Sequence, residues 1–370
     1  MSRSRILIIL PSYDAGGAEN YALRLIEHAG SARFEWHVTS GNLANRRLET
    51  AFASAGAGVH HASPGFGYPW QSLQFYRFLR QYRFDAVMSL NGVFGGVALG
   101  LSRIAGVPRR FAWHRRSTPA YAPTPMRRLY ARASLGLLNW ASTLILSNSR
   151  AALDQFYGPR WEHSLGFKMI PNGVDPERFK PRPELRSAIR ARLGISDDAL
   201  VIGHVGRVDP AKDHDTLFAT VRILRQTRRD IRLLLVGTGT DSAKFLERLA
   251  GYGIDDIAHG LGVREDVHDL YQAMDVFLFS SITEGQPNAL IEAMLSGIPI
   301  VATDIAPIRE ALPDFLHHRL FQARNARDAA AIIESLERSP SGQEEQARHW
   351  AAHQYDPERN FSAVLELLGA

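Results

Sequence analysis

Short apolar runs alternate with amphipathic segments along the whole of this 370-residue chain. Runs typical of buried strands lie at 5–10, 34–39, 86–90, 110–113 and 143–147, and again at 200–205, 232–236, 256–259, 276–280 and 300–303. Helical periodicity lies between them, for example at 18–29 and 70–81. This alternation predicts an α/β chain of two doubly wound parallel sheets, which bind ligands at the carboxyl ends of their strands.

A cluster of prolines separates the two series of strands. Four prolines lie between 171 and 183, a density that indicates a linker rather than a helix or strand. A chain of this length is also too long for one ordinary core. We therefore predict a first domain at 1–170 and a second at 171–355. Helical periodicity breaks at Pro357, and we expect the final segment, 356–370, to return to the first domain as a helix.

Composition excludes several classes of protein. The chain has no cysteine, so it has neither disulfides nor thiolate metal sites. The apolar run at 6–10 is followed by Pro11, which makes it too short for the core of a signal peptide. No stretch approaches the eighteen apolar residues of a membrane span. We expect a cytoplasmic protein that can also lie at the inner face of the cell membrane.

Charge is distributed unevenly between the two halves. Residues 1–170 hold 20 Lys and Arg against 8 Asp and Glu, whereas residues 171–370 hold 23 against 30. A basic half can face nucleic acid, anionic lipid or a phosphorylated acceptor, or can simply reflect Arg-rich codon usage. Arginines interleave with aromatic residues in one segment, at Arg109, Arg110, Arg115, Arg116, Arg127, Arg128 and Arg132 with Trp113, Tyr121 and Tyr130.

That segment has three interpretations. It can meet anionic lipid headgroups or a lipid-linked diphosphate, it can bind RNA, or it can consist of solvated helix faces. No RNA-binding motif accompanies it, so we expect no nucleic-acid partner and favour a peripheral contact with an anionic membrane surface.

Two cations follow the first strand of the second half. Gly206 and Arg207 come directly after the run at 200–205, and Lys212 lies five residues further on. Cations that converge at a strand end can neutralise a diphosphate leaving group as its charge develops. A surface loop with ordinary charges is the alternative.

A second motif joins two glutamates across a loop and a helix. Seven residues separate Glu284 from Glu292, and the first five of them are Gly285, Gln286, Pro287, Asn288 and Ala289. Pro287 suits the first turn of a helix, which leaves the amides near 285–289 to bind phosphate or sugar hydroxyls. We expect Glu284 in the loop and Glu292 one turn inside the helix. The carboxylate at each position could accept hydrogen bonds from both hydroxyls of a diol.

The first strand of the chain also ends at a glycine turn. Gly16 and Gly17 lie between the run at 5–10 and the next helix, so the backbone there can approach a ligand closely. A plain tight turn is equally compatible, since the segment is not a GxGxxG motif. In the same half, His114 follows the strand at 110–113 and is a candidate site residue.

These motifs together resemble the GT-B glycosyltransferases of the family 4 type, and the resemblance covers nearly the whole chain. It rests on Gly16-Gly17-Ala18-Glu19, Asn172-Gly173-Val174-Asp175, the Gly206-Arg207…Lys212 pair, the segment from Gly260 to Val267, and the two glutamates. The resemblance implies that the first domain binds the acceptor and the second binds a nucleotide sugar, with UDP the expected nucleotide.

Site roles also follow from the resemblance. It implies that Arg207 and Lys212 bind the diphosphate, Glu292 the ribose and Glu284 the transferred sugar. It places Arg264 beside the nucleotide base and His114 near the sugar and acceptor. It further implies a hexosyl or N-acetylhexosaminyl transfer with retention, no obligatory metal or other cofactor, and a glycan or polyprenyl-diphosphate-linked acceptor in polysaccharide or lipopolysaccharide synthesis.

Three other functions remain open from the sequence. A nucleotide-sugar epimerase has the same fold, but the two retained glutamates argue against it. An NAD-dependent oxidoreductase is supported only by the glycines Gly237 and Gly239, which lack a third glycine. A non-catalytic nucleotide-sugar sensor is disfavoured by the intact charged motifs.

Overall fold

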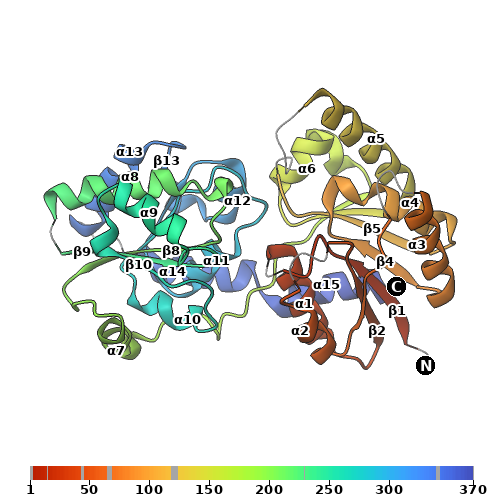
Figure 1. Ribbon diagram of the computed structural model, residues 1–370, viewed down its shortest axis with the longest axis horizontal. Helices are drawn as coiled ribbons and strands as arrows, with labels where there is room; N and C mark the ends of the chain where they lie inside the picture. The colour runs from red at the N-terminus through yellow and green to blue at the C-terminus, as the bar shows by residue number, and fades with distance from the viewer. Residues whose placement is uncertain are drawn as a thin grey trace. The chain divides into compact units, whose positions relative to one another are not determined.

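The computed structural model describes residues 3–14, 16–42, 46–64, 69–117, 124–228, 230–338 and 342–369. For Arg127, Glu337 and Arg338 it describes only the backbone. Tyr121 and the side chain of Arg127, both named above as part of the arginine segment, therefore lie outside the described residues. The chain divides into two compact units, one of residues 1–173 with 357–370 and one of residues 174–356 (Figure 1). We call them unit 1 and unit 2.

Unit 1 is built on a seven-stranded sheet of parallel strands in the order β3-β2-β1-β4-β5-β6-β7. The strands are β1 (Ser4–Ile9), β2 (Phe34–Thr39), β3 (Gly58–His60), β4 (Ala86–Ser89), β5 (Arg109–His114), β6 (Leu144–Ser147) and β7 (Phe167–Met169). The helices are α1 (Gly17–Ala29), α2 (Glu49–Ser54), α3 (Pro69–Tyr82), α4 (Gly96–Ile104), α5 (Pro125–Ala141), α6 (Arg150–Tyr157) and α15 (Pro357–Gly369). Short 3-10 turns occupy η1 (Gly92–Gly95) and η2 (Pro159–His163).

Helices cover both faces of this sheet because side chains alternate along each strand. In β1, Ile6 and Ile8 face a core shared with α1, α2 and α15, whereas Leu7 and Ile9 face a core shared with α3, α4 and α5. All four side chains are at most 1% exposed. A strand buried on both faces explains the continuous apolar run from which it was predicted.

Unit 2 repeats the plan with a six-stranded parallel sheet in the order β10-β9-β8-β11-β12-β13. The strands are β8 (Leu200–Val205), β9 (Ile231–Val236), β10 (Ala258–Gly260), β11 (Val276–Phe279), β12 (Ile300–Thr303) and β13 (Leu320–Phe321). The helices are α7 (Arg186–Arg192), α8 (His214–Thr227), α9 (Ala243–Gly251), α10 (Val267–Leu270), α11 (Asn288–Leu295), α12 (Ala306–Ala311), α13 (Ala326–Arg338) and α14 (Gln343–Gln354). The 3-10 turns are η3 (Pro183–Leu185), η4 (Pro210–Lys212), η5 (Asp255–Ile257), η6 (Tyr271–Ala273) and η7 (Asp314–Arg319).

The predicted fold class is confirmed, since both units are doubly wound α/β sheets of parallel strands. The strand expected at 256–259 is wrong in its first half, where Asp255 and Asp256 open a 3-10 turn and β10 begins only at Ala258. Aspartates favour turns over strands, and Arg225 holds Asp256 in this one at 2.5 and 2.6 Å. The short strands β3, β7 and β13 were not predicted, because two or three residues show no periodicity.

The boundary between the units lies at Gly173, three residues beyond the predicted position. Asn172 belongs to unit 1 because its side-chain oxygen accepts hydrogen bonds from Arg115 at 2.8 Å and Asn148 at 3.1 Å. Its backbone carbonyl accepts a third, from Asn360 of α15 at 3.1 Å. The predicted start of the returning segment, 356, lies one residue before the observed start of α15, which packs on α1. Among the described residues, no helix is long and apolar enough to cross a membrane.

Candidate active site

Two glycines meet at the carboxyl edge of the unit 2 sheet. Gly206 follows β8 and Gly237 follows the neighbouring strand β9. Gly237 has a φ of +137°, and a Cβ there would lie 2.3 Å from the carbonyl oxygen of Gly206. Only glycine therefore fits at 237, and the two loops contact each other through their backbones. Gly237, one of the two glycines that the sequence offered as weak evidence for an oxidoreductase, thus has a packing role.

Lys212 and Glu284 form an ion pair, although they are 72 positions apart in the sequence. Lys212 Nζ lies 2.5 Å from Glu284 Oε1, and the two side chains are only 18% and 13% exposed. The ammonium also lies 4.8 Å from the centroid of the Phe279 ring, a cation–π contact. The structure therefore brings together two of the residues predicted for catalysis, at the carboxyl edge where an α/β sheet binds its ligands.

Backbone contacts hold these two loops in register. Ser280 Oγ lies 2.8 Å from the carbonyl oxygen of Lys212 and 3.0 Å from that of Asp213, so its hydroxyl can donate to either. The amide of Ile282 donates to the carbonyl of Ala211 at 2.9 Å. Ser280 was not predicted as a site residue, and a lone serine after a strand carries no signal that would have identified it.

Asp213 shapes the turn that carries Lys212. Its backbone is left-handed, with a φ of +46°, an uncommon conformation for a residue with a side chain. The carboxylate caps α8, accepting from the hydroxyl of Thr216 at 2.6 Å and from its amide at 3.4 Å. The cap offsets the cost of the left-handed backbone and directs the chain from Lys212 into the helix.

The second glutamate is buried one turn inside α11. Glu292 is 8% exposed, and its Oε2 accepts a hydrogen bond from the Tyr271 hydroxyl at 3.2 Å. The same hydroxyl lies 3.1 Å from the carbonyl oxygen of Ala289. Pro287 was expected in the first turn of the helix, but its extended backbone makes it the N-cap, and the helix begins at Asn288. Tyr271 was missed because it lies 21 residues from its partner, with no motif joining them.

The two other predicted cations of unit 2 are more exposed. Arg207 is 43% exposed and lies 3.4 Å from Asp209. Arg264 follows β10 and makes two hydrogen bonds to Asp266, at 2.8 and 2.7 Å, which raise the pKa of the Arg264 guanidinium. Both arginines are on loops after strands of one sheet, as the predicted nucleotide site requires.

The glycine turn of unit 1 opens α1. Gly16 is the N-cap of the helix, and a Cβ there would lie 2.3 Å from the carboxylate of Glu19. Glu19 is 5% exposed and accepts from the Ser12 hydroxyl at 2.8 Å. A Cβ at position 16 would therefore displace the end of the Glu19 side chain, whereas a Cβ on Gly17 would meet nothing within 4 Å.

His114 is the last residue of β5, and its side chain is 1% exposed. Its ring stacks on Phe156 with 4.9 Å between centroids, and its Nε2 lies 2.8 Å from the Tyr157 hydroxyl. Burial lowers the pKa of His114 to about 4. The imidazole is therefore neutral and fixed at neutral pH, a state that can position a hydroxyl but contributes no positive charge.

Part of the predicted arginine segment is interior, which corrects that expectation. Arg115 lies 4.0 Å over the ring of Tyr21 and bonds to Asn172, and burial lowers the pKa of its guanidinium to about 10. Trp113 is fully buried. Helices cover both faces of the sheet, which buries Trp113 of β5, and Arg115, directly after that strand, is covered by Tyr21 of α1.

Comparison with known families decides the assignment. Residues 15–178 match the family model described as Glycosyltransferase Family 4, and residues 186–355 match the model described as Glycosyl transferases group 1. The chain belongs to the glycosyltransferases of the family 4 type. It is thus an enzyme that transfers glycosyl groups, as predicted.

Named relatives support this membership. EpsF of Bacillus subtilis (strain 168), which carries the name of a glycosyltransferase, is 25% identical over 308 residues, or 82% of this chain and 80% of EpsF. The D-inositol 3-phosphate glycosyltransferase of Geodermatophilus obscurus is 35% identical over 182 residues, which are 45% of this chain and 39% of that relative. The second likeness therefore spans less than half of either protein.

Solved structures of other proteins share the fold of this one. Anabaena HepE, in complex with UDP and glucose, superimposes with a TM-score of 0.82 at 20% identity, over 99% of both chains. WaaG, described as a glycosyltransferase involved in lipopolysaccharide biosynthesis, gives 0.74 at 17% identity, over 98% of this chain and 99% of WaaG. These likenesses confirm the GT-B fold.

Proposed function

We propose that this glycosyltransferase moves a hexosyl or N-acetylhexosaminyl group from a nucleotide sugar, with UDP as the nucleotide, and retains the anomeric configuration. The Lys212–Glu284 ion pair at the carboxyl edge of the unit 2 sheet is the observation that carries this proposal. The pair puts the Lys212 ammonium, which can bind a diphosphate, beside the Glu284 carboxylate, which can accept hydrogen bonds from sugar hydroxyls. The UDP and UDP-glucose complexes of HepE, which has the same fold, support the choice of nucleotide.

Each predicted residue has a role in this reaction. Arg207 and Lys212 stabilise the diphosphate as the bond from the anomeric carbon to its oxygen breaks. Glu284 holds hydroxyls of the sugar, and Glu292 those of the ribose. Arg264 and the amides near 285–289 complete the donor residues of unit 2, and Gly16 and Gly17 are the donor-binding residues that we propose in unit 1. We expect no obligatory metal.

We propose that the anomeric configuration is retained in one step rather than in two. A two-step mechanism needs a nucleophilic carboxylate about 5 Å from a second one across the bond. Glu284 is instead engaged with Lys212. We infer transfer on the face that the diphosphate leaves: the acceptor oxygen bonds to the anomeric carbon, and its proton passes to the departing phosphate oxygen. His114, neutral and buried, positions the sugar and acceptor.

The acceptor that we propose is a glycan or a polyprenyl-diphosphate-linked glycan. The part that WaaG plays in lipopolysaccharide biosynthesis is compatible with such an acceptor in polysaccharide or lipopolysaccharide synthesis. We place the reaction in the cytoplasm, at the inner face of the membrane.

One experiment tests both the donor and the stereochemistry. The enzyme is incubated with UDP-, GDP- and ADP-sugars and with mixed glycan acceptors, and the product linkage is determined by NMR. We expect an α-linked product from a UDP-α-sugar. A β-linked product would overturn retention and the role of Glu284, and sugar conversion without transfer would indicate an epimerase.

A further inference from the structure

One stretch of the chain is almost free of acidic residues. Between positions 50 and 153 there are twelve arginines and a single acid, Asp85. In the fold this stretch supplies α3, α4 and α5, which share one core on the same face of the unit 1 sheet. Helix α4 packs against both of the others. Their outer sides therefore form one surface, which we call the α3–α5 face (Figure 1).

Large apolar side chains are exposed in the same stretch of the chain. Of the eleven large hydrophobic residues that are exposed in the described part of the chain, seven lie between 70 and 140. They are Trp70, Leu73, Phe94, Ile104, Met126, Leu129 and Trp140. Met126 is 82% and Leu129 70% exposed, so neither is held by the core. A concentration of apolar surface of this kind marks a site of interaction.

The sequence of α5 arranges these side chains as a stripe. Met126, Leu129 and Trp140 are spaced at 3 and 11 residues, which places them on one side of a helix. Leu138, on the opposite side, and Ala141 are fully buried in the core that α5 shares with the sheet. Helix α5 thus has an inner apolar face that the core explains and an outer one that it does not.

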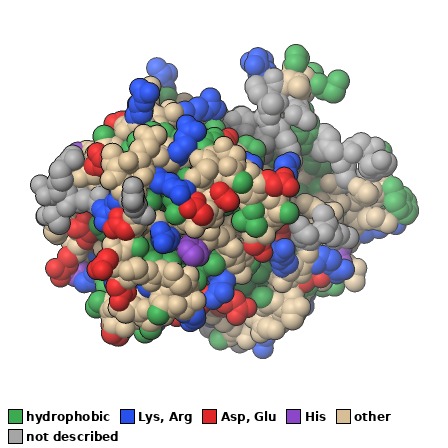
Figure 2. Space-filling view, turned by 60° about the vertical axis from the view of Figure 1, so that its left-hand side comes forward, with side chains coloured by type: hydrophobic (Ala, Val, Ile, Leu, Met, Phe, Trp, Pro, Cys, Tyr) green, Lys and Arg blue, Asp and Glu red, His purple; other side chains and the backbone are tan. Residues whose placement is uncertain are grey.

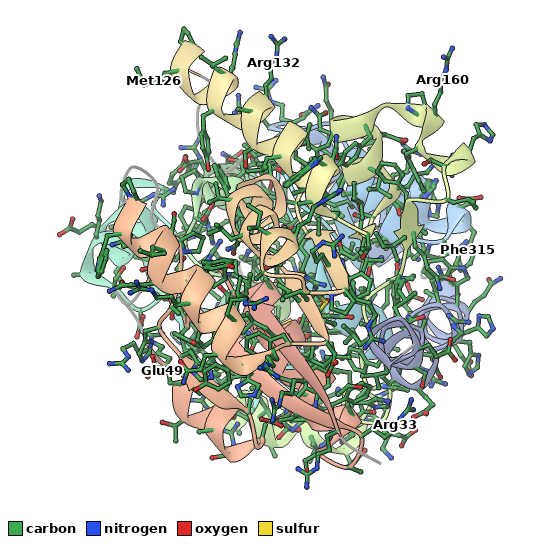
Figure 3. The ribbon with its side chains drawn as sticks, turned by 90° about the vertical axis from the view of Figure 1, so that its right-hand side faces the viewer. Arg33, Glu49, Met126, Arg132, Arg160 and Phe315 are labelled. Atoms are coloured by element: carbon green, nitrogen blue, oxygen red, sulfur yellow. The ribbon has the colours of Figure 1, made fainter. Side chains whose placement is uncertain are left out.

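Arginines flank this outer stripe. Arg128 and Arg132 are exposed on α5 beside the apolar residues. Figure 3 shows Met126 and Arg132 pointing away from the body of unit 1, at one end of α5 and partway along it. Figure 2, whose near side is unit 2, shows acidic and basic side chains interspersed there. The α3–α5 face differs from that surface in combining arginine with aliphatic groups and lacking acids.

We propose that the α3–α5 face docks on an anionic lipid bilayer, with Met126 and Leu129 entering the headgroup region and Arg128 and Arg132 binding lipid phosphates. Exposed aliphatic side chains flanked by cations suit this interface. A second copy of the chain fits poorly, because a self-complementary contact would set arginines against arginines. Single-stranded nucleic acid requires aromatic stacking, and the most exposed side chains are aliphatic.

Helix α5 follows β5, so its first turn starts from the carboxyl edge where His114 lies. Docking here would hold that edge close to the membrane. The inference rests on the proposed function in one respect, because a lipid-linked acceptor is the reason to hold this edge of the sheet near the membrane.

The test uses the full chain and sedimentation with vesicles. We expect binding to vesicles of phosphatidylcholine with phosphatidylglycerol, reversed by salt, and little binding to phosphatidylcholine alone. Arg128→Glu with Arg132→Glu should weaken binding at least about tenfold, and Met126→Ser with Leu129→Ser by a similar factor. All four residues are exposed, so both variants should fold.

Matched controls come from elsewhere in unit 1. Arg33→Glu with Arg160→Glu makes the same charge change at exposed positions outside α3–α5, and Leu165→Ser removes a fully exposed leucine. These controls should bind as the parent does. The proposal would be overturned if the control variants lost vesicle binding to the same extent, or if the parent pelleted equally with both types of vesicle. It would also be overturned if Arg128 and Arg132 mediated dimerisation of the chain or tighter binding to RNA than to vesicles. Transfer to a soluble acceptor, assayed without vesicles, should be unchanged in every variant, so failure of the proposed function would appear separately.

Discussion

At the scale of single residues, the Lys212–Glu284 pair is central. Lys212→Ala should lower kcat/KM by roughly 100-fold or more, because the ammonium matters most as charge develops on the leaving diphosphate. Steady-state kinetics with saturating acceptor measure this effect. A second lysine offers a matched control, since Lys180 pairs with Glu177 at 3.0 Å but is 53% exposed. Lys180→Ala should leave kcat/KM within about twofold, and equal losses in the two variants would remove the special role of Lys212.

Buried histidines make the stability of the chain depend on pH. Burial lowers the pKa of His114 and of His214 to about 4, from about 6.5 when unfolded. Between these values the unfolded chain binds more protons than the folded one. The stability contribution is therefore fully present above pH 6.5 and is lost as the pH falls toward 4, at up to about 1.4 kcal/mol per pH unit for each histidine.

Urea unfolding at pH 7 and pH 5 measures this dependence. His114→Gln removes one of the titrations and can still bond to Tyr157, so the loss of unfolding free energy between the two pH values should become smaller. A loss as large as in the parent would show that burial does not lower the pKa of His114.

At the scale of elements, α15 ties the end of the chain into unit 1. Phe361 is 3% exposed, forms an edge contact with Tyr21 at 5.5 Å between centroids, and packs against Gly173. Phe361→Ala should cost about 3–5 kcal/mol of unfolding free energy, since it leaves a cavity between α15 and α1. Glu366→Ala, at an exposed position of the same helix, should be nearly neutral. Chemical denaturation of both variants checks this, and equal stability would contradict the packing.

At the scale of the whole molecule, each unit has its own hydrophobic cores. Apart from Gly16 and Gly17, all the residues proposed to bind the donor belong to unit 2. UDP should therefore protect amides near 206–213 and 284–292 from hydrogen exchange. At a hundred times Kd it should add about 2.7 kcal/mol of stability. Protection confined to unit 1 would refute the assignment of the donor site. UDP with Lys212→Ala is the control and should protect less.

Much of this architecture was predictable because it is encoded locally. Apolar runs and helical periodicity depend on neighbouring residues, so the strands at 34–39, 200–205 and 300–303 were predicted with the bounds observed. Turn chemistry likewise placed Glu284 in a loop after β11 and Glu292 one turn inside α11. The sequence by itself determined the two parallel sheets and the strand ends that carry the proposed site.

Only the tertiary structure decided which side chains meet and which face water. Lys212 contacts Glu284 because β8 and β11 are neighbours in the sheet, a pairing that no local pattern specifies. Arg115 was expected at the surface, but its guanidinium lies over the ring of Tyr21, because α1 packs beside the end of β5. The outer stripe of α5 resembles a core face in sequence, and it is exposed because the sheet covers only one side of the helix. Burial depends on the elements that pack together, and these are brought together by the whole fold.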